Sequence, residues 1–131
     1  MKVFIFECSN ATYLECIQKS VFGSNLPWPT QITKGDHCCL YHYEVGTLFA
    51  LWHATTDGAR NLVPKVWGGR FPFQVKVALV SPEIVEFPKA TFGDAFLNRA
   101  TGKFDNIYDG DRADALFRLI HDQPSQAHTP K

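Results

Sequence analysis

The stretch VWGGRFPFQVKV, residues 66–77, organises the fold of this chain. Every second residue from position 71 is apolar, and this period of two predicts a strand whose core-facing side is formed by Phe71, Phe73, Val75 and Val77. Gln74 and Lys76 point to the other side. Trp67 precedes the strand on a glycine turn, where we expect its indole to be exposed. The indole either fills the core or forms half of a ligand site.

The composition predicts one folded domain. The chain has 131 residues and is 45% hydrophobic, which suits a single domain over residues 1–122 with a flexible polar tail over residues 123–131. No apolar run reaches the roughly 18 residues of a transmembrane helix. The apolar start, residues 1–6, is too short for a signal peptide. We therefore expect an intracellular protein, cytoplasmic or nuclear, with no membrane partner.

Cysteine spacing and charge limit the chemistry further. An intracellular setting favours free thiols at Cys8, Cys16, Cys38 and Cys39. No Cys-x-x-Cys pair is present, which argues against zinc, and we expect no metal and no cofactor. The formal net charge of zero lacks the basic excess of many nucleic-acid-binding proteins. A protein that binds a single nucleotide needs only a local basic patch, so the neutral net charge does not exclude nucleic-acid binding.

The chain opens with a strand and a helix. Residues 2–7 are almost all apolar, which is typical of a central strand covered on both faces. Thr12 and Glu15 have the spacing of a capping box. This spacing predicts a helix whose apolar stripe runs to Val21 and which ends at Gly23.

Two loops carry candidate ligand contacts. Ser9 and Asn10 lie at the start of the predicted helix, where they either cap it or bind the polar edge of a ligand. Trp28 stands between two prolines that stiffen its loop. Its indole either fills the core or stacks on a flat ligand.

Alternating apolar residues over 37–43 and 47–55 predict a hairpin with two apolar faces. Its histidines, His42 and His53, are interpreted as structural, because no motif ties a serine or cysteine nucleophile to them. The connector over residues 59–65 then leads to the strand described first.

The second half completes an α+β pattern. We expect a short strand over residues 84–87 and a broken helix over residues 89–100. Asp111 caps a final helix with an amphipathic stripe formed by Ala113, Leu116, Phe117 and Ile120. The predicted architecture is a mixed, partly closed β-barrel of about five or six strands, flanked by an N-terminal and a C-terminal helix.

The order of short motifs resembles the DCD (development and cell death) domain over about 120 positions, although each motif is weak by itself. The matching segments are FIFEC at 4–8, VFG at 21–23, ATTDG at 54–58, PFQV at 72–75 and GKF at 102–104. Ser24 and Asn25 depart from the pattern, because they replace the Leu-Pro of the family's FGLP motif. The resemblance implies the PUA-like fold, which DCD domains share with the YTH and EVE readers of modified nucleotides.

Residues 67–71, WGGRF, are similar to the W-x-G-[KR]-F run of YTH domains. That resemblance implies an aromatic cage around a modified base, with Trp28 and Trp67 as walls. Ser9 and Asn10 become its polar floor, and Gly68 lets the backbone approach a flat ligand. Trp52 or Tyr43 is the candidate third wall.

The leading hypothesis is a non-catalytic reader that takes a modified or flipped base of DNA or RNA into this pocket. Its expected phosphate contacts are Arg60, Lys65, Arg70 and Lys76. The alternative interpretation of these four side chains is a solvated surface without a ligand. The alternative is a protein-interaction module of stress and cell-death signalling, with a protein partner or a fused effector domain. A nucleoside-modifying hydrolase is a third class, without a nucleophile–base pair in the sequence to support it.

Overall fold

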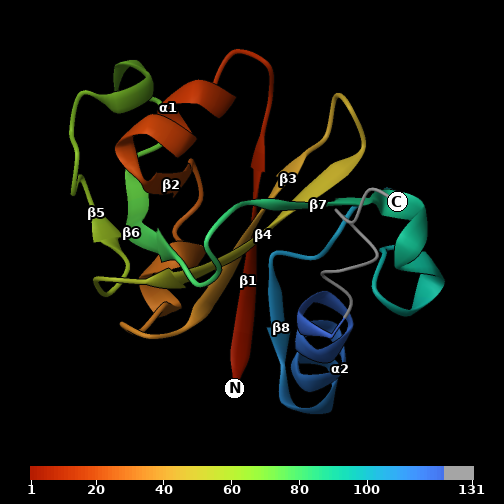
Figure 1. Cartoon of the computed structure of the whole chain (residues 1–131). Helices are drawn as coiled ribbons and strands as arrows, with labels where there is room; N and C mark the ends of the chain where they lie inside the picture. Colours follow the sequence, from red (N-terminus) through yellow and green to blue (C-terminus); the bar gives the residue numbers. More distant parts are fainter. Residues whose placement is uncertain (123–131) are drawn as a thin grey trace.

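The computed structural model describes residues 1–122, which form eight strands and two helices (Figure 1). The predicted tail, residues 123–131, lies outside the described residues. The strands are β1 (Lys2–Cys8), β2 (Val21–Ser24), β3 (His37–His42), β4 (Thr47–Ala54), β5 (Ala59–Arg60), β6 (Phe73–Leu79), β7 (Val85–Pro88) and β8 (Ile107–Asp109). The helices are α1 (Tyr13–Lys19) and α2 (Gly110–His121), and the 3₁₀ turns are η1 (Trp28–Gln31), η2 (Val66–Gly69), η3 (Lys89–Thr91) and η4 (Gly93–Ala95).

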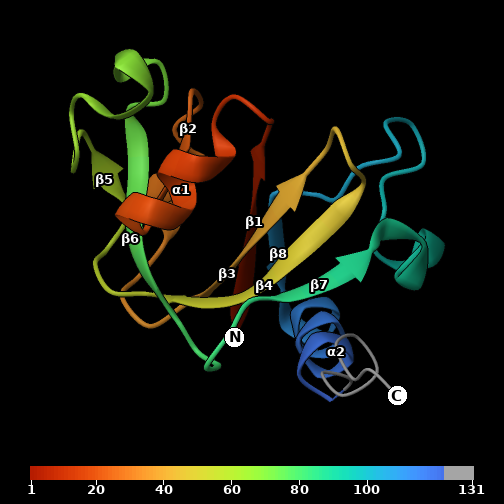
Figure 2. The same cartoon turned by 45° about the horizontal axis from the view of Figure 1, so that its top comes forward.

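The strands form one curled sheet in the order β2-β6-β4-β3-β1-β8, with β5 paired to β6 and β7 paired to β4. β1 runs parallel to β3, whereas the other pairs are antiparallel. Figure 2 shows α1 near β2 and β6 and α2 beside β8. This arrangement confirms the predicted α+β, partly closed barrel. Three strands of two to four residues, β2, β5 and β8, raise the count above the predicted five or six.

β1 separates two core clusters. Val3 and Ile5 face the cluster that includes Leu116 of α2. Phe4 and Phe6 face the cluster inside the curl of the sheet. β1 is therefore covered on both faces, as its apolar sequence predicts.

The first helix is shorter than predicted. It ends at Lys19, and Ser20 caps it in the left-handed conformation (φ 52°). Val21 and Phe22 are fully buried and belong to β2, which pairs with β6. The prediction that the helix reaches Val21 was wrong, because pairing with β6 buries these two side chains better than a surface helix does.

The capping box was also a wrong prediction. The Thr12 side chain accepts no hydrogen bond from an amide of the helix and instead accepts one from Ser9 N–H (2.9 Å). The Glu15 carboxylate accepts one from Trp67 N–H (3.4 Å), far along the chain. Both side chains thus accept hydrogen bonds from loops around α1 and not from the first turn of the helix.

The organising strand begins at Phe73, and its expected outward-facing residue, Gln74, is fully buried. The Gln74 amide nitrogen donates to the carbonyls of Val63 and Phe71 (3.1 Å each), and its oxygen accepts from Val63 N–H (2.7 Å). The two phenylalanines at positions 71 and 73 are only partly buried. The connector thus covers the face of β6 that the alternation assigned to solvent.

The later elements follow the prediction more closely. The broken helix is two 3₁₀ turns that meet near Gly93, which has a φ of 61°. Ala113, Leu116 and Ile120 are buried along α2, but its N-cap is Asp109 instead of Asp111. All four cysteines are free and buried, as predicted. No helix within residues 1–122 has the length and apolar character needed to cross a bilayer.

Candidate functional site

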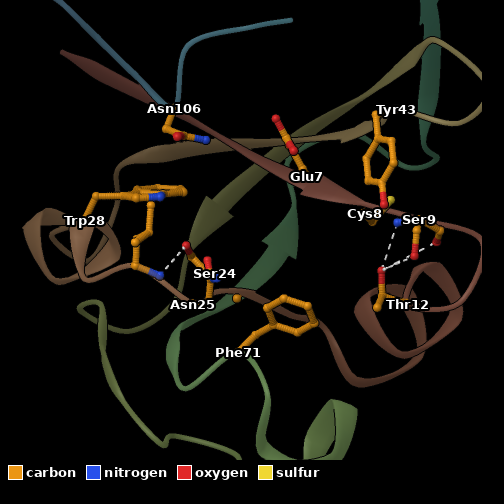
Figure 3. Close-up of a pocket in the computed structure, with 12 residues that line it drawn as sticks. Glu7, Cys8, Ser9, Thr12, Ser24, Asn25, Trp28, Tyr43, Phe71 and Asn106 are labelled. Atoms are coloured by element: carbon orange, nitrogen blue, oxygen red, sulfur yellow. Dashed lines mark hydrogen bonds between the residues drawn. The ribbon is translucent and has the colours of Figure 1, made fainter. Parts of the chain in front are cut away.

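A pocket of about 280 Å³ opens between the edges of β1 and β2 (Figure 3). We call this place the seam, defined by Glu7 and Cys8 on β1 and by Gly23 and Ser24 on β2. The two strands lie near each other but are not paired in the sheet order. The pocket therefore occupies the point where the barrel stays open.

Three aromatic side chains line this pocket: Trp28 of η1, Tyr43 after β3 and Phe71 before β6. Trp28 is half-buried, and its indole packs on Phe6 with a ring-centroid distance of 4.5 Å. Tyr43 is 45% exposed. In Figure 3, Trp28 lies on one side of the pocket and Ser9 and Thr12 lie on the opposite side. The pocket therefore offers aromatic surface to a flat ligand.

The edge of β1 supplies main-chain groups. Ile5 N–H donates to the Asn106 carbonyl, and the Asn106 side-chain amide donates to the Ile5 carbonyl (2.9 Å each). Main-chain groups two residues apart point to the same side of a strand, so the N–H and C=O of Glu7 face the pocket. The next residue on that side is Ser9, whose N–H and carbonyl are already bonded to Thr12 and Tyr13. Glu7 thus leaves one donor and one acceptor for a ligand.

Of the two predicted floor residues, the structure brings only Ser9 to the pocket. The Ser9 hydroxyl accepts a hydrogen bond from Ala11 N–H (3.2 Å) and lines the pocket wall. Asn10 is exposed and does not line it, and its N–H donates to the Glu44 carboxylate (2.6 Å).

Trp67 lies beneath the pocket and is only 4% exposed, so the expectation of an exposed indole was wrong. Its Nε1 donates to the Thr12 carbonyl (3.3 Å), and its ring packs edge-on against Phe71 at 5.7 Å. It also packs against Gly23, where an added Cβ would lie 2.5 Å from the indole. A small cavity of about 20 Å³ is lined by Trp67 together with Glu7 and Gly23 of the seam. Trp67 is therefore a support of the pocket and does not line it.

The other two predicted pocket residues lie elsewhere. Gly68 is exposed in η2 (φ 65°), with open space where a Cβ would be. Trp52 is buried in the core, edge-on to Phe22 at 4.9 Å. Tyr43 is thus the candidate third wall that reaches the pocket.

The four predicted phosphate contacts are exposed, and none lines the pocket. They are Arg60, Lys65, Arg70 and Lys76. Arg70 comes nearest to it through Phe71, because its guanidinium lies over that ring at 5.5 Å. Its Nε donates to the Trp67 carbonyl (3.2 Å).

Lys103 lies near the pocket and was not predicted from the sequence. The ammonium of Lys103 lies 4.9 Å from the Tyr43 ring centroid and 3.6 Å from the Glu7 carboxylate. The segment that carries it folds back through a bridge between Leu97 and Phe104. No local pattern identifies such a residue, because only the tertiary fold brings it near β1.

Cys8 is the thiol that lines the pocket. Burial raises the pKa of Cys8 to about 12, and the nearby carboxylates of Glu44 and Glu7 act in the same direction. The thiol is therefore protonated and a poor nucleophile at neutral pH. Within residues 1–122, no three His, Cys, Asp or Glu side chains come together in a way suited to a metal ion.

Comparisons with known proteins agree with the fold. The family model described as "Development and cell death domain" matches residues 2–120. The DCD domain-containing protein NRP-A of Glycine max is 32% identical over 84 residues, which cover 56% of this chain and 23% of the relative. The B2 protein of Daucus carota is 31% identical over 84 residues, which cover 56% of this chain and 41% of the relative. The chain thus spans less than half of the length of these relatives.

Solved structures of YTH domains share the fold at low sequence identity. The Mmi1 YTH domain superposes with a TM-score of 0.71 at 11% identity, covering 96% of this chain and 99% of that domain. The YTH domain of Zygosaccharomyces rouxii MRB1 protein, solved with N6-methyladenosine RNA, gives 0.59 at 13% identity, covering 91% and 86%. The Toxoplasma CPSF4-YTH domain gives 0.64 at 17% identity, covering 99% and 89%.

Proposed function

The chain belongs to the Development and cell death domain family, and from this premise we propose that it is a nucleic-acid reader. The reader takes one base of a DNA or RNA strand into the seam pocket and does no chemistry on it. The observation that carries the proposal is the open pocket of about 280 Å³ with three aromatic side chains in its lining.

The aromatic lining provides the affinity. Stacking of a base on an aromatic side chain contributes about 1–3 kcal/mol, and every base has a face that can stack. Trp28 is the main stacking surface, because Phe6 supports its indole from behind. Phe71 takes the wall position that the sequence assigned to Trp67, which instead supports Phe71 from below.

The polar groups of the seam contact the edge of the base. Glu7 presents one N–H and one C=O to the pocket, and every base has a donor and an acceptor next to each other on its pairing edge. Asn106 already makes such a pair of hydrogen bonds with Ile5, two residues earlier on β1. Its main-chain carbonyl accepts from Ile5 N–H, and its side-chain amide donates to the Ile5 carbonyl. A modified base fits the proposal, because the energy needed to flip a base out of the stack is lowest when the base is damaged, mismatched or already single-stranded.

The phosphate groups contact a local basic segment. Residues 58–82 contain four basic residues and no acidic residue, although the whole chain has a net charge of zero. Arg70 is the member of this segment beside the pocket. Binding should therefore weaken with salt, because phosphate contacts release counterions.

The fold likeness supports this class of ligand. YTH domains with this fold have been solved with RNA, and two of them with N6-methyladenosine or its RNA. The thiol of Cys8 in the pocket lining is protonated and a poor nucleophile, which fits a reader that does no chemistry on the base.

Fluorescence anisotropy with single-stranded oligonucleotides tests the proposal. We expect Trp28→Ala to weaken binding by about tenfold or more, the loss that follows from one base stack. Trp28→Phe keeps an aromatic face and should retain most of the affinity. Arg70→Gln should reduce the salt dependence, whereas Lys34→Gln, on an exposed turn before β3, serves as the charge-matched control.

Binding that is equal in wild type and Trp28→Ala, and that salt erases in both, would contradict the proposal. That result would favour the alternative function, a protein-interaction module.

A further inference from the structure

We propose that the seam pocket selects bases whose ring carries a formal positive charge from N-methylation, such as 1-methyladenine or 7-methylguanine. This inference rests on the proposed function, because it names the class of base that the same pocket takes.

The charge of the lining is the first step. Among the described residues, the one charged residue that lines the pocket is Glu7, and no lysine or arginine lines it. The Glu7 side chain is 35% exposed, so its carboxylate stays accessible to a ligand at the pocket rim. A carboxylate attracts a cation and accepts hydrogen bonds from amino and ring N–H groups.

The aromatic lining is the second step. The faces of Trp28, Tyr43 and Phe71 carry the negative end of the ring quadrupole, and a cation that stacks on such a face gains over a neutral ring of the same shape. An indole is the best of these partners, and Trp28 is half-buried, so the contact is partly shielded from water. The three aromatic side chains and the carboxylate thus favour the same charge.

A cation of the protein itself already lies beside two residues of the pocket lining. The Lys103 ammonium already lies over the Tyr43 ring at 4.9 Å and beside Glu7 at 3.6 Å. This geometry demonstrates that the rim holds a positive charge between an aromatic face and a carboxylate. Lys103 is 43% exposed in its side chain, so it is able to move aside when a cationic ring enters.

Negative charge also lies near Cys8, which lines the pocket. Burial is the main cause of its raised pKa, and the carboxylates of Glu44 and Glu7 raise it further. Glu44 lies close by, because it accepts a hydrogen bond from Asn10 N–H. Two carboxylates, those of Glu7 and Glu44, therefore lie near Cys8.

The test compares two isomers in one oligonucleotide. Nine-nucleotide single strands carry adenine, N6-methyladenine or 1-methyladenine at the central position, as RNA and as DNA. The two methylated bases are isomers in their neutral forms, but only 1-methyladenine binds a further proton and is cationic at neutral pH. We expect wild type to bind 1-methyladenine about fivefold more tightly than its isomer, the ratio that about 1 kcal/mol of combined attraction from the aromatic faces and the Glu7 carboxylate gives.

Two variants break the Glu7–Lys103 ion pair in opposite ways. Glu7→Gln removes the carboxylate and should lower the isomer ratio to about twofold or less. Lys103→Gln leaves the carboxylate in place and should keep the ratio or increase it. Melting temperatures of both variants close to wild type verify that they fold.

Each contrary outcome has a distinct meaning. Equal affinity for the two isomers, with binding that Trp28→Ala still abolishes, overturns this inference and leaves the proposed function standing. A ratio that Glu7→Gln does not change overturns the role of the carboxylate. Absence of any Trp28-dependent binding overturns the proposed function itself. Tighter binding of a trimethyllysine peptide than of every oligonucleotide assigns the cation site to a protein partner and overturns the inference too.

Discussion

The two tryptophan turns, η1 and η2, use their indoles in opposite ways. Trp28 in η1 is half-buried and lines the seam pocket, whereas Trp67 in η2 is 4% exposed and lies beneath it. In η1 the anchor is Pro29, which is buried and packs closely on Gly58, so the indole beside it stays at the surface. In η2 the chain passes through left-handed conformations at Trp67 and Gly68, and the indole turns inward.

The difference teaches that a tryptophan beside glycines is not by itself a ligand wall. The glycines let η2 turn sharply, and the Trp67 indole is buried in the core. The prolines of η1 instead fix a surface turn. The same side chain therefore has a structural role at one turn and is a candidate ligand contact at the other.

The largest expected effect is the contrast between the two alanine variants. Trp67→Ala should destabilise the fold by about 3–5 kcal/mol, because it empties a buried site. Trp28→Ala should cost about 1–2 kcal/mol, since its indole is partly solvated, but should lose ligand binding. Urea denaturation measures both values. Equal losses of stability would show that the two turns do not differ in the way described.

A second variant tests how η2 is held. Gln74→Leu leaves the Val63 N–H and the Phe71 C=O without partners, whereas the Val63 C=O keeps its bond from Val66 N–H, so we expect a loss of about 2–4 kcal/mol. Gln18→Leu, at an exposed position of α1, is the matched control and should change stability little. Circular dichroism melts with urea titration give the comparison. If both variants behave alike, the connector is not anchored by the Gln74 amide.

The smallest expected effect of a single side chain is a response to alkaline pH. Burial raises the pKa of Cys8, which lines the seam pocket, and of Cys16, which lines the small cavity with Trp67, from the usual value of 9.0. The folded chain then holds protons that the unfolded chain releases, so stability falls as pH rises above about 9, by at most about 1.4 kcal/mol per pH unit for each thiol. Urea midpoints at pH 8, 9 and 10 measure this fall. Cys16→Ser should lessen the fall by the share of one thiol, because burial also raises the pKa of Cys38 and Cys39, and an unchanged slope in that variant would assign the effect to other groups.

Local pattern predicted the long elements of the fold well. β1, the β3–β4 hairpin and the buried stripe of α2 follow from apolar periodicity, which only an element of sufficient length displays. Val21–Ser24 looked helical because its two apolar residues continue the stripe of α1. Only pairing with β6, about fifty residues later in the chain, makes this segment a strand.

The site was less predictable, because residues from distant parts of the chain assemble it. Ser9 and Trp28 were expected and do line the pocket, but Glu7, Phe71 and Asn106 were not expected. Phe71 follows the alternation of a core strand, and its position before the first paired residue of β6 frees it for the pocket. Lys103 and Glu7 are brought together by folding alone.

The short open edge of β1 also limits what shape of molecule the seam accepts. A longer unpaired edge would be a template for an added strand from a second chain. Here Asn106 occupies the step at Ile5, and Ser9 satisfies its own groups within the turn before α1. One residue of free main chain remains, which is too little for a ladder of strand hydrogen bonds. The β1 side of the opening is thus too short to pair with an extended peptide.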